Sequence, residues 1–148
     1  MWDEKRVLGY IQNQIQESLG LDYKAKGALT PITDKVKHEI TKDVSAMANS
    51  AGGIIIYGIA EYQEDDKKHL PEKVELLDFS EFSKERLEQV IHSGVQPKID
   101  GILIHPVQIG QNLNQGVYVV EIPQSNTAHQ VAKDYRYYKR YNFLSAPM

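Results

Sequence analysis

The stretch KDVSAMANSAGGIIIYGIAE, residues 42–61, has the pattern of a helix that ends at a glycine pair and leads directly into a buried strand. The helical pattern stops at Asn49, and Gly52 is the natural left-handed residue after a helix end. The apolar run that begins at Ile54 is rich in β-branched residues and does not alternate with polar ones. Such a run is typical of a strand covered on both faces, so we place it at the centre of a sheet.

The order of helix and strand decides between two uses of this glycine pair. A phosphate-binding glycine turn leads from a strand into a helix, so that the helix N-terminus faces the anion. Here the helix comes first, and the turn presents the carbonyl end of the helix. The chain also contains neither G-x-x-x-x-G-K-[ST] nor G-x-G-x-x-G. We therefore assign Asn49, Gly52, Gly53 and Gly58 a structural role and expect the domain not to bind ATP.

The composition favours one globular domain of 148 residues, with 41% hydrophobic and 25% charged residues. No apolar run is long enough to cross a bilayer, and the charged start MWDEKRVLGYIQ is unlike a signal peptide. The absence of cysteine excludes disulfides, thiol catalysis and zinc–thiolate sites. We expect a cytoplasmic domain over residues 1–148, either alone or as the N-terminal part of a longer protein.

Hydrophobic periodicity predicts the remaining elements. An amphipathic helix is expected from Val7 to about residue 20, a strand follows at residues 21–26, and a second helix is capped by Thr33 or Asp34. A third helix is expected after a cap at Asp78 or Ser80. Three further strands are predicted at residues 101–109, 116–123 and 135–142, the first two as a hairpin. This order predicts an α+β fold, a mixed sheet with about three packed helices.

Three motifs resemble the Schlafen AlbA_2 family. SAMANSAGGIIIYGIAE is similar to its central A-x-A-N-[ST]-x-G-G signature with the following apolar strand and G-[VI]-x-[DE]. ESLGLDYKAK, residues 17–26, resembles E-S-x-x-x-E-F-K, and residues 129–142 resemble the closing segment with its Tyr-Tyr pair and Arg. The motifs occur in the family's order and span nearly the whole chain. The resemblance implies a Schlafen AlbA_2-like fold and a nucleic-acid-binding module of a transcriptional regulator.

The resemblance also implies a candidate catalytic site, because related domains of eukaryotic Schlafens form a metal-dependent endoribonuclease on three acids. The matching positions here are Glu17, Asp22, where the family has Glu, and Glu61, although Ala60 stands at a position that is often acidic. Three carboxylates suit Mg²⁺ or Mn²⁺, and Lys24 on the strand face of Asp22 would neutralise a phosphate. The alternative is that these acids are solvated charges or helix partners and that no cofactor is required.

The closing strand offers a binding surface of a different kind. Residues 135–142 are rich in basic and aromatic residues, and strand alternation puts Arg136, Tyr138 and Arg140 on one face and Tyr135, Tyr137, Lys139 and Tyr141 on the other. Cations contact phosphates, and an exposed tyrosine stacks on an unpaired base. The alternative is that a tyrosine face packs on the core and the arginine face is solvated. The expected nucleic-acid-binding residues are Lys24, Lys26, Arg136, Tyr138, Lys139 and Arg140.

Three functions therefore remain open on the sequence. The net charge of −3 requires any nucleic-acid binding to come from a local basic patch. The first function is a module that binds DNA or RNA with low sequence specificity, as a monomer or a homodimer and without a membrane. The second is a metal-dependent endoribonuclease that uses Glu17, Asp22 and Glu61. The third is a protein-interaction scaffold. No histidine pair has H-x-x-x-H spacing, and His129 in the closing segment is the one histidine we single out.

Overall fold

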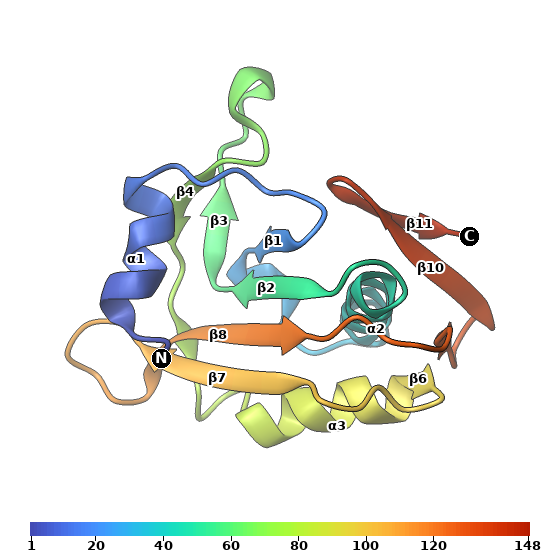
Figure 1. The fold of residues 1–148 in the computed structure, drawn as a ribbon. Helices are drawn as coiled ribbons and strands as arrows, with labels where there is room; N and C mark the ends of the chain where they lie inside the picture. Colours follow the sequence, from blue (N-terminus) through green and yellow to red (C-terminus); the bar gives the residue numbers. More distant parts are fainter.

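The computed structural model describes residues 1–148 and has three α-helices, α1 (Glu4–Gln12), α2 (Asp34–Ala48) and α3 (Lys84–Gly94). The α+β fold with a mixed sheet is therefore confirmed (Figure 1). None of these helices combines the length and the apolar character that crossing a membrane requires. The strands are β1 (Leu21–Lys24), β2 (Gly53–Tyr57), β3 (Ile59–Glu61), β4 (Pro71–Val74), β5 (Leu77–Asp78), β6 (Val95–Gln96), β7 (Leu103–Gln108), β8 (Gln115–Ile122), β9 (Gln130–Val131), β10 (Arg136–Tyr141) and β11 (Leu144–Pro147).

The central sheet has the order β1-β2-β8-β5, and β7 pairs with β8 as well. Strand β1 runs parallel to β2, with Leu21 opposite Ile54, whereas β8 is antiparallel to β2, β5 and β7. Strand β2 thus lies between β1 and β8, the central position predicted from its apolar run. The predicted hairpin of the two strands after α3 is also present, as β7 and β8.

Both faces of the central sheet are covered, and this explains why β2 does not alternate. Ile55 points into the larger core, which α2 and α3 close on one face. Its neighbour Ile56 points into a second core on the opposite face, together with Val7 of α1. Neither isoleucine has solvent-exposed surface. A strand buried on both faces needs apolar residues at successive positions.

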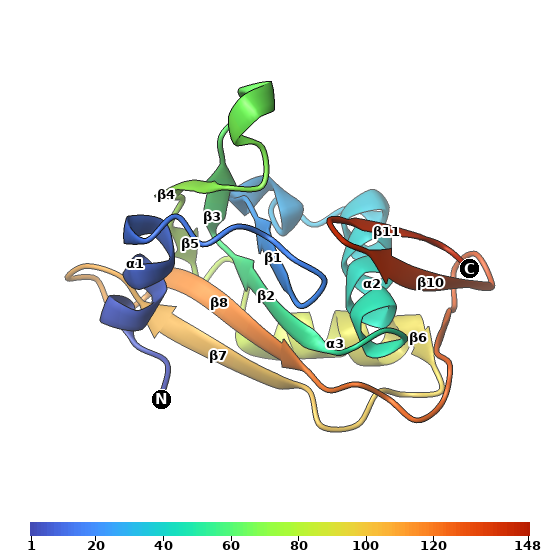
Figure 2. The ribbon, with the colours of Figure 1, turned by 45° about the horizontal axis from the view of Figure 1, so that its top comes forward.

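A second sheet, of order β11-β10-β9-β6, lies on the other side of α2 from the central sheet (Figures 1 and 2). Helix α2 therefore packs against the central sheet on one flank and against β10 on the other. Tyr138 of β10 is buried there with Ala46 of α2 and Val131 of β9. This arrangement divides β10 into a side that faces α2 and a side that faces solvent.

The segment from Asn49 to Gly53 connects these layers. The N–H of Gly52 donates to the Met47 carbonyl at 2.8 Å. Gly52 has a φ of +76°, so the helix ends in the left-handed conformation that glycine favours. The side-chain amide of Asn49 donates to the carbonyls of His129 and Tyr138, and its Oδ1 accepts from the His129 N–H. This asparagine thus ties the end of α2 to the second sheet, and the contacts of the segment are structural.

Two local predictions, both of helix boundaries, were wrong. Helix α1 ends at Gln12 rather than near residue 20, because Gln14 adopts a φ of +48°. Helix α3 is capped by Ser83, whose Oγ accepts from the Arg86 N–H, because Leu77–Asp78 is taken up by pairing with β8. His129 is buried against the Pro97 carbonyl and has a structural position.

Replacing Gly53 by alanine should strongly destabilise the fold. Gly53 has φ of +150°, and an added Cβ would lie 2.5 Å from the Gly20 carbonyl oxygen. We expect a loss of more than about 2 kcal/mol in the free energy of unfolding, measured by urea denaturation. The control Gly9→Ala meets no atom within 4 Å inside α1 and should gain up to about 1 kcal/mol. Equal effects of the two changes would contradict the close approach at Gly53.

Candidate functional site

The three acids singled out in the sequence converge beside β1. Glu17 precedes β1, Asp22 lies within it, and Glu61 ends β3. The side chains of Glu17 and Asp22 are each 3% exposed, and that of Glu61 is 27% exposed. The neighbouring carboxyls of Asp22 and Glu61 both raise the pKa of Glu17. The parallel pairing of β1 with β2 brings these parts of the chain together.

Glu17 is the most strongly perturbed carboxyl of this cluster. Its Oε2 accepts from the Tyr23 N–H at 2.9 Å, and its Oε1 lies 2.8 Å from His69 Nδ1. Burial raises the pKa of Glu17 to about 10, and the nearby Asp22 adds to the increase. Glu17 therefore carries a proton at neutral pH.

His69 completes the cluster, and sequence reasoning missed it. Its Nδ1 also lies 3.6 Å from Glu61 Oε2, and one ligand atom from each of Glu17, Glu61 and His69 lies within 4.8 Å of the others. The imidazole stacks on Phe143, with 3.9 Å between ring centroids, so the β10–β11 turn packs against one of its faces. His69 lies in a charged loop 52 residues after Glu17, and no local spacing signals its approach.

Asp22 is engaged by cations rather than open to a metal. Its Oδ2 lies 3.3 Å from Arg140 Nη1 and 3.5 Å from Lys24 Nζ. Lys24 also lies 3.3 Å from Asp43. Burial by itself lowers the pKa of Lys24, but the carboxylates of Asp43 and Asp22 raise it above its ordinary value. The charges of Lys24 and Asp22 therefore compensate each other inside the protein.

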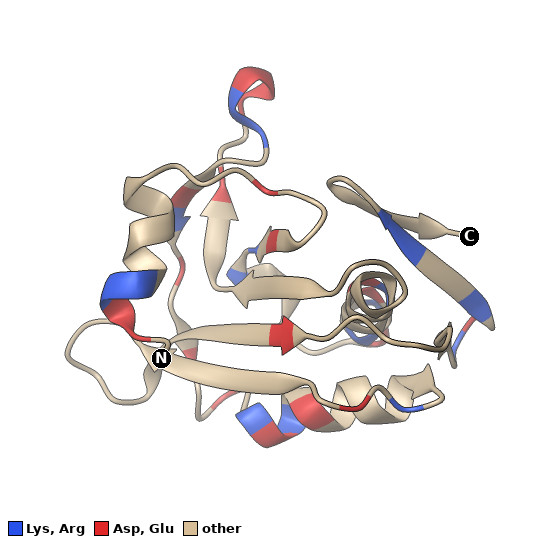
Figure 3. Ribbon diagram, in the orientation of Figure 1, with Lys and Arg blue, Asp and Glu red and all other residues tan.

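The side of β10 that carries Tyr138 and Arg140, expected to contact nucleic acid, is buried. Tyr138 and Arg140 are 4% and 3% exposed, because this side of the strand packs against α2 and β1. Two predicted nucleic-acid contacts are thus buried. The opposite side carries Tyr137, Lys139 and Tyr141, all exposed. Figure 3 shows basic positions near both ends of β10.

The comparisons with known proteins agree with the fold and the motifs. Residues 17–148 match the family model "Schlafen, AlbA_2". The chain belongs to the Schlafen AlbA_2 family. Membership in this family associates the domain with a nucleic-acid-related function. We found no similar sequence among curated proteins.

A solved structure shows the same fold. The crystal structure of the DIP2311 protein from Corynebacterium diphtheriae is similar with a TM-score of 0.59 and 17% sequence identity. The similarity covers 97% of this chain and 29% of that chain, so this AlbA_2 domain spans less than a third of the longer protein. At this identity the likeness concerns the fold alone.

The protonated state of Glu17 predicts a specific pH dependence. The pKa is about 10 in the folded protein against an ordinary 4.5, so unfolding releases a proton between these values. The stabilisation is complete below pH 4.5 and is lost as the pH rises toward 10, by up to about 1.4 kcal/mol per pH unit. Glu17→Gln cannot titrate and should lose this fall between pH 6 and pH 8.5 in urea denaturation. The exposed control Glu72→Gln should keep it, and parallel curves for wild type and Glu17→Gln would contradict a buried proton.

Proposed function

We propose that this Schlafen AlbA_2 domain binds nucleic acid through the outer face of β10, defined as Tyr137, Lys139 and Tyr141, together with Tyr135 and Arg136, which are exposed at the start of the strand. The observation that carries the proposal is the exposure of an aromatic, a basic and an aromatic side chain at alternate positions of one strand. Tyr137 is 41% and Tyr141 49% exposed. The family's association with nucleic acids supports the same assignment. That the domain serves a transcriptional regulator is the more specific part of the proposal, and it rests on the family resemblance.

The chemistry of the outer face suits an unpaired strand. Lys139 and Arg136 form no ion pair within the protein, so both charges are available to phosphates. Tyr137 and Tyr141 offer ring faces on which bases stack without regard to their identity. Phosphate contacts and stacking carry little sequence information, so binding of low specificity to DNA or RNA follows.

Lys24 and Lys26, both expected in the interface, differ in whether their charge is already paired within the protein. The charge of Lys24 is held by Asp22 and Asp43, so Lys24 contributes little to an external field. Lys26 is exposed just after β1 and forms no ion pair of its own. We therefore centre the interface on Arg136 and Lys139, with Lys26 at most as an extension.

The double change Arg136→Gln and Lys139→Gln should weaken binding to every strand by a similar factor. Each lost phosphate contact should reduce the slope of log affinity against log salt by about 0.7 for a single strand. Fluorescence anisotropy with labelled single-stranded DNA and RNA at several salt concentrations measures both quantities. The control Lys67→Gln with Lys68→Gln removes the same charge from the exposed β3–β4 loop and should leave affinity nearly unchanged. If the two double variants behave alike, the interface lies elsewhere.

A metal-dependent nuclease is the second candidate, and one observation favours it. Glu61 Oε2 is buried without a hydrogen-bond partner, and it belongs to the Glu17–Glu61–His69 cluster. Carboxylate and imidazole atoms at this spacing fit Mn²⁺, which would supply a polarised water and a countercharge for a phosphate. Asp22 does not fit this role as predicted, since Arg140 and Lys24 already hold its carboxylate.

Manganese should raise the melting temperature if the cluster binds it. Mass action predicts a rise of about 3 °C at a concentration near ten times the dissociation constant. Glu61→Gln should abolish the rise, whereas Glu64→Gln on the nearby exposed loop should keep it. We expect no RNA cleavage, because Arg140 and Lys24 already hold the carboxylate of Asp22 and Phe143 packs on one face of His69. Mn²⁺-dependent cleavage that is lost in Glu61→Gln would place the nuclease function first.

A further inference from the structure

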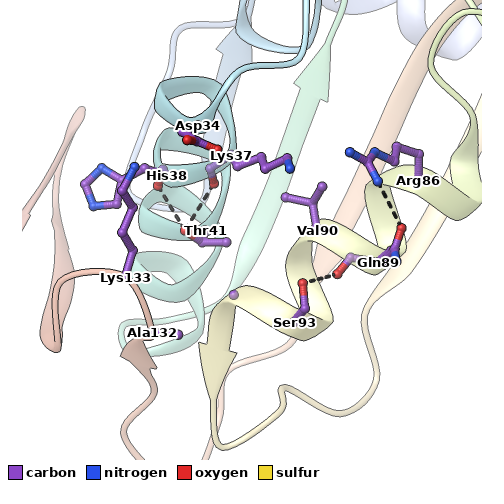
Figure 4. Close-up of a pocket in the computed structure, with 11 residues that line it drawn as sticks. Asp34, Lys37, His38, Thr41, Arg86, Gln89, Val90, Ser93, Ala132 and Lys133 are labelled. Atoms are coloured by element: carbon purple, nitrogen blue, oxygen red, sulfur yellow. Dashed lines mark hydrogen bonds between the residues drawn. The ribbon is translucent and has the colours of Figure 1, made fainter.

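A polar cleft lies between α2 and α3 and shares no residue with the outer face of β10 (Figure 4). Its volume is about 460 Å³. Residues of the two helices form its walls, and the segment after β9 closes one end. The lining residues are Asp34, Lys37, His38, Thr41, Arg86, Gln89, Val90, Ser93, Gly94, Ala132 and Lys133.

The floor of this cleft is set by the close approach of the two helices. A side chain at Gly94 would overlap the methyl group of Thr41. The hydroxyl of Thr41 donates to carbonyls of its own helix, and that of Ser93 donates to the Gln89 carbonyl at 2.7 Å. These hydroxyl protons already have acceptors within the protein, so the donors left for a ligand are those of the cations and the side-chain amide of Gln89.

Three cations line the cleft without a carboxylate partner. Lys37, Arg86 and Lys133 form no ion pair, and Asp34 is the one acid among the lining residues. Figure 4 shows Lys37 extending from α2 toward α3. Arg86 Nη1 donates to Gln89 Oε1 at 3.2 Å, which orients the guanidinium. Cations gathered in a concave site repel one another until an anion enters.

We propose that this cleft binds a phosphate group carried by a small, polar, base-free molecule or by the end of a nucleic-acid strand. Its volume is in the range of small-ligand sites, and a guanidinium is suited to phosphate oxygens. Only Val90 and Ala132 among the lining residues are hydrophobic. The one aromatic ring, the imidazole of His38, is held by Asp134 and Tyr138, and no Phe, Tyr or Trp is present to stack on a base. A sugar phosphate or a diphosphate matches this lining better than a purine nucleotide does. The site is independent of the proposed nucleic-acid interface.

Calorimetric titration of the whole chain with inorganic pyrophosphate and with ribose 5-phosphate tests the proposal. Saturable binding is expected, and Lys37→Gln and Arg86→Gln should each weaken it at least about tenfold, as for hydrogen bonds to charged groups. The matched control Lys84→Gln removes a charge from α3, the helix that carries Arg86, at a position outside the cleft. It should change affinity less than twofold. No saturable heat with either ligand in the wild type overturns the proposal, and so does equal affinity in Lys37→Gln and the wild type.

A second measurement uses only the wild type, so it tests the proposal even if a variant does not fold. Pyrophosphate added to the isotopically labelled wild type should shift the amide resonances of Thr41, Ser93 and Gly94. Shifts confined to β10 overturn the assignment. The two sources of phosphate are separated by competition. A 5′-phosphorylated oligonucleotide that displaces pyrophosphate, when its 5′-hydroxyl counterpart does not, assigns a strand end. Failure of both to displace bound pyrophosphate assigns a small molecule.

Discussion

The buried ion pair between Asp22 and Arg140 joins the two sheets of this domain, and the position of β10 depends on it. Arg140 also donates through Nη2 to the carbonyls of Ser18 and Leu21, so one guanidinium binds three groups around β1. A buried pair of this kind adds little net stability compared with apolar packing, but removing one partner costs about 3–5 kcal/mol. Its main effect is therefore geometric. It holds the β10–β11 hairpin in one orientation against α2 and the central sheet.

This orientation determines which chemistry the domain presents to its surroundings. Because Arg140 faces inward, Tyr137, Lys139 and Tyr141 face solvent. Because the hairpin turn follows directly, Phe143 stacks on His69 beside the acid cluster. Asp22 was expected to be a metal ligand and Arg140 a phosphate contact. In the structure these two side chains neutralise each other.

The sequence was sufficient for the parts of the fold that depend on local pattern. The apolar run after Gly53 predicted a strand buried on both faces, and the order of helix and strand at Gly52 predicted a structural turn. The orientation of β10 was beyond such reasoning, because alternation separates two faces without saying which one packs. Both faces carry tyrosine and a cation, so only the docking of α2 decides between them. His69 was missed because its approach to Glu17 depends on a loop that returns from β3 to β4.

The net negative charge of the chain does not oppose binding of phosphates at its surface. Glu17 is protonated in the folded state, and Asp22 and Asp43 are compensated by Arg140 and Lys24. The two ion pairs each sum to zero in the formal charge of −3 and in the external potential, and the protonation of Glu17 makes the net charge less negative by one. In physiological salt a charge acts over about 8 Å, so a ligand responds to the few groups it approaches. The outer face of β10 and the cleft between α2 and α3 can therefore each attract an anion on an acidic protein, because uncompensated cations lie at both places.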